Sequence, residues 1–261
     1  MNLFDSIILG IVQGITEFLP VSSTGHLILA GHLLKIPASE FLKSFDIAIQ
    51  SGTMLAVIAL YWKTFLEPAR LKKILAAFIP TAFIGFVMYK LVKHFLLGNA
   101  SVVLWSLLIG GICLIVFERR YRTTPAIDAP ARDGVHPDFI SYKQAILIGL
   151  CQSLAIIPGV SRSAATILGG LSLGLPRKTI VEFSFLLAVP TLLAATALDL
   201  IKSKVVFTGD QISLLFAGTA VSFIVGMIVI QLFLNFVRKH TFTIFGIYRI
   251  LLALLLLLIA K

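Results

Sequence analysis

The sequence predicts an all-α polytopic membrane protein made of two inverted-topology repeats, each a re-entrant helical hairpin plus three transmembrane helices. Composition is the first reason: of the 261 residues, 58% are hydrophobic and only 13% are charged. The mean hydropathy of +1.01 excludes an ordinary soluble domain. The apolar runs are long and continuous, which indicates helices rather than the alternating strands of a barrel. The third reason is an internal similarity between residues 10–34 and 149–173.

This similarity centres on a Pro-x-x-Ser break that occurs in both stretches. A shift of 138 residues places Pro158 on Pro20 and Ser161 on Ser23, and a shift near half the chain length suggests duplication. The segment between the two copies is rich in Pro and Asp and has no hydrophobic periodicity, so we expect a cytoplasmic linker there. The predicted parts are a first repeat at 1–118, a linker at 119–142 and a second repeat at 143–261.

Each repeat is expected to begin with a hairpin that does not cross the membrane. Residues 6–19 predict a helix of 14 residues, about 21 Å long at 1.5 Å per residue, which is shorter than the roughly 30 Å core of a bilayer. Pro20 ends that helix, and residues 24–34 predict a second short helix that returns. The matching hairpin is expected at 144–157 and 162–175. The segments expected to span the membrane are 43–63, 75–93, 100–118, 180–200, 212–236 and 243–260.

Positive charge between these segments sets the orientation. We assign the net charge of +10 to topology and anionic lipid, and expect no nucleic-acid partner. If the loop with Arg119, Arg120 and Arg122 is cytoplasmic, that side carries thirteen Lys and Arg residues against seven on the other. Both termini then lie outside, the hairpins enter from opposite sides, and their breaks meet near the midplane.

Each break starts a new helix whose N-terminus points into the membrane. Free backbone N–H groups and the helix dipole bind anions there, and Arg162 adds a planar donor fork suited to phosphate oxygens. Two such ends facing each other predict a site for a polyanion. Hydroxyl groups near the breaks either add donors or only cap the helices: Ser22, Ser23, Thr24, Ser161, Ser163 and Thr166.

Glu17 and His26 indicate catalysis rather than binding alone. Glu17 lies four residues after Gln13 on the same helix face, and a carboxylate serves a hydrolytic site as a base. His26 follows Ser23 by three residues and is expected near Glu17 across the break. Ser23, His26 or a water held by Glu17 could be the nucleophile, and the residues leave this choice open. Arg249, central in the last span, needs an acidic partner or an aqueous pocket.

Three runs of residues carry a family resemblance: Gln13-x-x-x-Glu17, Leu19-Pro-Val-Ser-Ser-Thr-Gly-His26 and Pro158-Gly-Val-Ser-Arg-Ser-Ala-Ala-Thr166. They resemble the signature regions of the bacterial undecaprenyl-diphosphate phosphatase family, which is linked to bacitracin resistance. The similarity extends over nearly the whole chain. The family pattern allows Glu or Gln at the first position, and Gln13 removes one carboxylate here, which disfavours a mechanism that needs two.

The resemblance implies a multi-pass enzyme of the bacterial inner membrane with a site open to the periplasmic side. Its reaction would be hydrolysis of undecaprenyl diphosphate to undecaprenyl phosphate and phosphate, which recycles the lipid carrier of peptidoglycan synthesis. A divalent cation, Mg²⁺ or Ca²⁺, is implied, with Glu17 as a ligand. The implied catalytic residues are Glu17, Ser23, His26 and Arg162, and the implied substrate-binding residues are Gln13, Ser22, Thr24, Gly159, Ser161, Ser163 and Thr166.

A lipid-phosphate transporter or flippase is the competing interpretation, either instead of the phosphatase or as a second activity, because inverted repeats with broken helices also build transporters. Membrane lipid is a partner in both cases. The oligomeric state stays open, with a homodimer among the alternatives, and so does the preferred prenyl length. Cys113 and Cys151 both lie in apolar runs, so we expect neither a disulfide nor a metal site from them.

Overall fold

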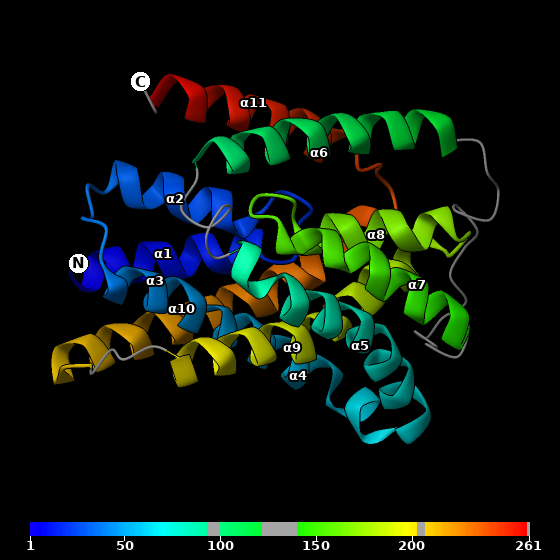
Figure 1. Cartoon of the computed structure of the whole chain (residues 1–261), viewed down its shortest axis with the longest axis horizontal. Coiled ribbons are helices and arrows are strands. Elements are labelled where there is room, and N and C mark those ends of the chain that lie inside the picture. The colour runs from blue at the N-terminus through cyan, green and yellow to red at the C-terminus, as the bar shows by residue number, and fades with distance from the viewer. Residues whose placement is uncertain (93–99, 122–139, 203–206, 260–261) are drawn as a thin grey trace.

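A computed structural model describes residues 1–92, 100–121, 140–202 and 207–259 of the chain (Figure 1). Over these residues the chain is helical and contains no strand. Most of the predicted linker, residues 122–139, lies outside the described residues. The helices of the first half are α1 (Leu3–Thr16), α2 (Ser23–Leu33), α3 (Glu40–Ala48), α4 (Gln50–Leu66), α5 (Pro68–Leu91) and α6 (Ala100–Tyr121). Those of the second half are α7 (Tyr142–Gln152), the 3-10 turn η3 (Ser153–Ile156), α8 (Arg162–Ser172), α9 (Arg177–Lys202), α10 (Gly209–Val237) and α11 (Thr243–Ile259).

Five helical segments are long and apolar enough to cross a membrane, and each coincides with a predicted span. They are Glu40–Leu66, Pro68–Met88, Ser101–Arg120, Arg177–Leu198 and Gly209–Val237. The sixth predicted span is α11, which has 17 described helical residues, fewer than the roughly 20 that cross a bilayer core. The chain is therefore a helical membrane protein, with α11 at the short end of the range.

The short helices that precede and follow each break form as predicted. Helix α1 begins at a capping box in which Asn2 and Asp5 each accept a hydrogen bond from the other's backbone N–H. It ends at Thr16, so that Glu17 stands at its C-cap. Helix α7 begins at an equivalent box, formed by Ser141 and Gln144.

The two breaks match at a spacing of 139 residues, not at the 138 that the sequence comparison predicted. Helices α2 and α8 occupy positions 23–33 and 162–172, and their N-caps are Ser22 and Ser161. The backbone of both serines is left-handed, with φ of 73° and 69°, a conformation that costs a non-glycine residue about 1–3 kcal/mol. The alignment of Pro158 with Pro20 is therefore one residue off, because Gly159 occupies the position equivalent to Pro20. Gly159 has φ of +90°, which glycine adopts without strain.

Packing places the two hairpins against equivalent partners. Helix α1 packs on α10 and α7 packs on α5, while α6 pairs with α11 and α4 with α9. In Figure 1 the α1–α2 and α7–α8 hairpins approach from opposite ends of the molecule, and α6 and α11 lie side by side along one edge. The α7–α5 contact is close because Gly149 has no side chain: a Cβ there would collide with the backbone of Ala77. The centre of the core is aromatic, with Phe18 and Phe185 edge to face at 5.1 Å between ring centroids.

A buried ion pair joins the ends of three helices away from the breaks. Both guanidinium nitrogens of Arg177 donate to the Glu118 carboxylate, at 2.5 and 2.8 Å. The Phe242 backbone N–H donates to the same carboxylate at 2.9 Å. Such a bidentate pair fixes the relative positions of α6, α9 and the turn before α11.

Candidate active site

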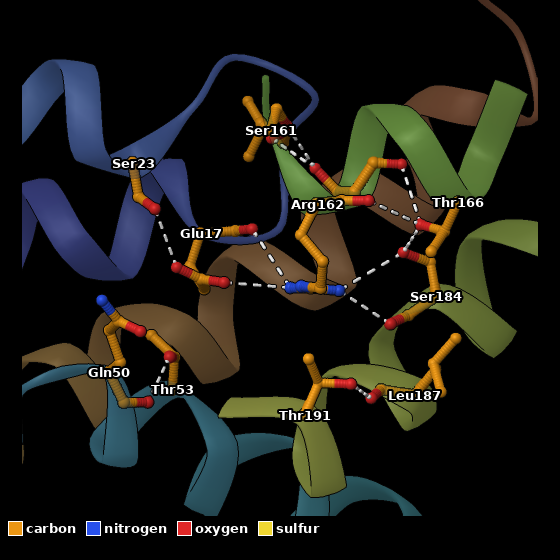
Figure 2. A network of polar contacts seen from close by, with 12 residues as sticks. Glu17, Ser23, Gln50, Thr53, Ser161, Arg162, Thr166, Ser184, Leu187 and Thr191 are labelled. Atoms are coloured by element: carbon orange, nitrogen blue, oxygen red, sulfur yellow. Dashed lines mark hydrogen bonds and ion pairs between the residues drawn. The ribbon is translucent and has the colours of Figure 1, made fainter. Parts of the chain in front are cut away.

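The two breaks bring Glu17 and Arg162 together, although 145 residues separate them (Figure 2). Nη2 of Arg162 donates to Oε1 of Glu17 at 3.0 Å, and both side chains are more than nine-tenths buried. A second contact joins the same breaks, because the Ser163 hydroxyl donates to the Leu19 carbonyl at 2.8 Å. The site is therefore formed by both halves of the chain.

Arg162 is fixed by hydrogen bonds to helix α9, on the side away from Glu17. Its Nη1 donates to the Ser184 carbonyl at 2.8 Å, and the Ser184 and Thr166 hydroxyls are 2.6 Å apart. Thr166 is fully buried and also bonds the Arg162 carbonyl of its own helix. The guanidinium is thus fixed in one orientation, yet its buried Nε has no hydrogen-bond partner. A buried unpaired donor of this kind is often found where a side chain has a binding or catalytic role.

Glu17 is surrounded by donors on the other side of the ion pair. Its Oε2 accepts from Gln13 Nε2 at 2.8 Å and from the Ser23 hydroxyl at 2.9 Å. The Ser23 contact has the geometry of a nucleophile beside a general base. Gln13 is fully buried, and its Oε1 atom has no partner.

The N-termini of helices α2 and α8 lie at the two breaks. Ser22 makes no side-chain cap for α2, so its hydroxyl leaves the first N–H groups of that helix free of side-chain acceptors. At α8 the Ser161 hydroxyl accepts from Ala164 N–H at 3.3 Å and lies 3.1 Å from the Ser163 hydroxyl. N–H groups at such ends bind anions. With Arg162 between them, the arrangement favours a phosphate-bearing ligand.

Comparison with known proteins identifies the family. The model of the family described as bacitracin resistance protein BacA matches residues 6–255. The chain belongs to the BacA family. A protein named undecaprenyl-diphosphatase from Aquifex aeolicus is 49% identical over 255 residues, covering 97% of each chain. A protein of the same name from Bdellovibrio bacteriovorus is 46% identical over 260 residues, covering 99% of this chain and 96% of the relative.

In this BacA-family chain the structure gathers some of the predicted site residues and separates others. Gln13, Glu17, Ser23 and Arg162 form one network. Ser161, Ser163 and Thr166 line the start of α8, where their hydroxyls bond each other and nearby carbonyls. Thr24 is exposed one residue past Ser23. Gly159 is buried against α6, where a Cβ would come within 2.8 Å of the Val103 carbonyl.

The hydrogen bonds of His26, which the sequence placed near Glu17, go to other residues. Its Nδ1 is 2.8 Å from the Ser22 carbonyl, one turn back, and its Nε2 is 2.7 Å from the Tyr248 hydroxyl. The two rings also stack, with 5.5 Å between centroids. The imidazole of His26 therefore contacts α11. Tyr248 carried no signal that sequence reasoning could have used.

The prediction that Arg249 has an acidic partner or an aqueous pocket is wrong. The side chain is 0% exposed, and its guanidinium donates to backbone carbonyls of α6 and of both breaks. No sequence pattern marks these partners, because every residue supplies a backbone carbonyl group.

The donor set fits a divalent cation only if the substrate completes it. Within the described part of the chain no cluster of three His, Cys, Asp or Glu side chains could hold a metal. Glu17 is the one carboxylate in the network, and the unpaired Oε1 of Gln13 is a neutral oxygen. Mg²⁺ binds through one or two carboxylates together with substrate phosphates, and Glu17 supplies one carboxylate, whereas the Gln13 amide turns its nitrogen rather than its oxygen toward that carboxylate.

Proposed function

We propose that this chain is an undecaprenyl-diphosphatase, which hydrolyses undecaprenyl diphosphate to undecaprenyl phosphate and phosphate. One observation carries the proposal: a guanidinium, a carboxylate and a hydroxyl from two distant breaks meet at 2.9–3.0 Å where two helix N-termini open. The names of the relatives support the same reaction and substrate. Membrane lipid surrounds the apolar helices and accommodates the prenyl tail.

The contacts favour Ser23 over the other nucleophiles. Incoming phosphate oxygens compete with Glu17 for the Arg162 donors, which frees the carboxylate to take the Ser23 proton. The Ser23 oxygen then attacks the terminal phosphorus, and the bond to the bridging oxygen breaks, releasing undecaprenyl phosphate. Glu17 passes the Ser23 proton to the departing undecaprenyl phosphate and is ionised again. In a second step the carboxylate takes a proton from a water, which attacks the phosphoserine, releases phosphate and restores the Ser23 hydroxyl. His26 is less suited to attack because Ser22 and Tyr248 occupy both its nitrogens.

The remaining residues bind and orient in this scheme. Arg162 and the N–H groups of α2 and α8 hold the phosphates, with Ser22, Thr24, Gly159 and Ser161 at the helix starts. Ser163 and Thr166 position Arg162 and the breaks through the contacts described above. A divalent cation, Mg²⁺ or Ca²⁺, bound by Glu17 and the diphosphate would neutralise phosphate charge.

Phosphate release by the purified chain in detergent micelles tests this function. We expect one phosphate from each undecaprenyl diphosphate, because hydrolysis needs no sealed compartment. A variant with Arg162→Ala is the matched control and should release little. A transporter or flippase, the alternative that the comparisons do not favour, would move lipid in sealed vesicles and release no phosphate in micelles.

We further propose the inner membrane as the location, a site open to the periplasm, and inverted repeats at 1–118 and 143–261. Matching element bounds at a spacing of 139 residues and the equivalent packing of α1 and α7 support the repeats. The excess of positive charge on one side supports the orientation.

Single cysteines test this orientation in a background with Cys113 and Cys151 replaced by Ala. We expect a membrane-impermeant thiol reagent to label Ala38→Cys, in the exposed turn after α2, in intact cells. His240→Cys, in the exposed turn before α11, should react only after permeabilisation. The opposite labelling pattern would invert the assignment of both faces.

A further inference from the structure

Arg249 is the largest fully buried side chain in the described part of the molecule, and it contacts both breaks. Its Nη1 donates to the Pro20 carbonyl at 3.3 Å and to the Val160 carbonyl at 3.1 Å. Its Nη2 donates to the Gly159 carbonyl at 3.0 Å. One side chain of α11 therefore bonds the first break at one residue and the second break at two.

The same guanidinium is anchored to α6. Nη2 donates to the Ser106 carbonyl at 2.9 Å and Nε to the Leu107 carbonyl at 3.4 Å. The five N–H groups of the guanidinium match five carbonyl acceptors. No ion pair with a carboxylate forms among the described residues, so the positive charge is balanced by peptide dipoles alone.

These bonds fix the direction of backbone groups at the anion site. Every described peptide bond is trans, so a carbonyl that points at Arg249 turns the N–H of the next residue the opposite way. Because the Val160 carbonyl faces Arg249, the Ser161 N–H at the start of α8 points away from it. A buried unpaired charge stabilises a fold poorly compared with an apolar side chain, which favours a functional reason for its presence.

We propose that Arg249 is a positioning residue for phosphoryl transfer. It holds the two breaks at a fixed separation and, through the Val160 carbonyl, turns the Ser161 N–H at the start of α8 away from itself and toward the diphosphate. It touches no reacting atom and acts through the backbone of residues 20, 159 and 160. This inference rests on the proposed phosphatase function.

Two variants disturb this arrangement in different ways. Arg249→Lys keeps the charge, but an ammonium group has three donors and cannot serve five carbonyls. Gly110→Ala leaves Arg249 in the sequence and displaces its guanidinium, because the added Cβ would lie 2.7 Å from the guanidinium carbon. Gly85→Ala is the matched control, since its Cβ meets a single atom, of Ile156, at 3.9 Å.

The experiment measures kcat and KM of the full chain for undecaprenyl diphosphate in micelles, per folded protein from size-exclusion chromatography. We expect both disturbing variants to lower kcat by about 10- to 100-fold, because donors aimed at developing charge act mainly in the transition state. We expect KM to change by less than about threefold, since losing contacts that strengthen only in the transition state lowers kcat without weakening ground-state binding. Gly85→Ala should keep kcat within about twofold, as substitutions away from special features do.

The outcomes separate this inference from the function on which it rests. If the unaltered chain releases no phosphate, the proposed function fails. If it does, and kcat per folded protein in Arg249→Lys and Gly110→Ala stays within about twofold, the positioning role is overturned. Loss of folded protein in both variants, with Gly85→Ala intact, would also overturn it, because Arg249 would then serve folding alone.

Discussion

Arg162→Lys is expected to lose about 2–4 kcal/mol of transition-state stabilisation, measured as kcat/KM for undecaprenyl diphosphate. The planar guanidinium spans from the Ser184 carbonyl to the Glu17 carboxylate and still presents an unpaired Nε. A lysine ammonium is a compact point charge and cannot reach all three positions at once. Arg162→Ala should be at least as damaged.

Arg177→Lys is the matched control for this substitution. Arg177 is equally buried and also bonds a carboxylate, that of Glu118, but at a place away from the breaks. We expect it to lower the thermal midpoint while kcat/KM of the folded protein stays close to that of the unaltered chain. If Arg162→Lys behaves like Arg177→Lys, the guanidinium has only a structural role.

Glu17→Gln is expected to lower kcat by at least about 10²-fold, because the Ser23 hydroxyl loses its proton acceptor. The amide keeps the shape of the side chain, and its oxygen can still accept from Arg162, so the fold should persist. Glu118→Gln, at the other buried ion pair, controls for the loss of a buried carboxylate. Near-normal turnover in the purified Glu17→Gln protein would remove this residue from the mechanism.

Glu17 and Arg162 should also behave as a functional unit. Combining Glu17→Gln with Arg162→Ala should cost less than the sum of the two single losses, because residues that act together are non-additive. Fully additive losses in kcat/KM would mean that the two hairpins act separately, and the single shared site would be wrong.

The sequence was informative where a local rule decides the structure. Pro20 and the short apolar runs around it predicted a helix ending before residue 20 and another starting near 24, and α1 and α2 follow this closely. The meeting of Glu17 with Arg162 followed from the cost of burying either charge alone. The structure provides that partner across 145 residues.

The sequence was uninformative where backbone conformation decides. The left-handed φ of Ser22 and Ser161 leaves no mark in composition. The predicted spacing between the two breaks was one residue short because Pro158 was aligned with Pro20, whereas the helix bounds place Gly159 at that position. The contact of His26 with Tyr248 joins residues 222 positions apart, and no helical spacing predicts it. The partners of Arg249 are carbonyl groups, and only the three-dimensional path of the breaks shows which ones lie nearby.

The long sequence separation of Glu17 and Arg162 has a consequence for biosynthesis. A ribosome that adds about 5–20 residues per second makes the second hairpin on the order of 10 s after the first. During that interval the nascent chain carries a carboxylate near the membrane interior without its counter-ion, which is unfavourable in lipid. We therefore expect the first hairpin to gain its full stability in the membrane only after the second hairpin has been inserted.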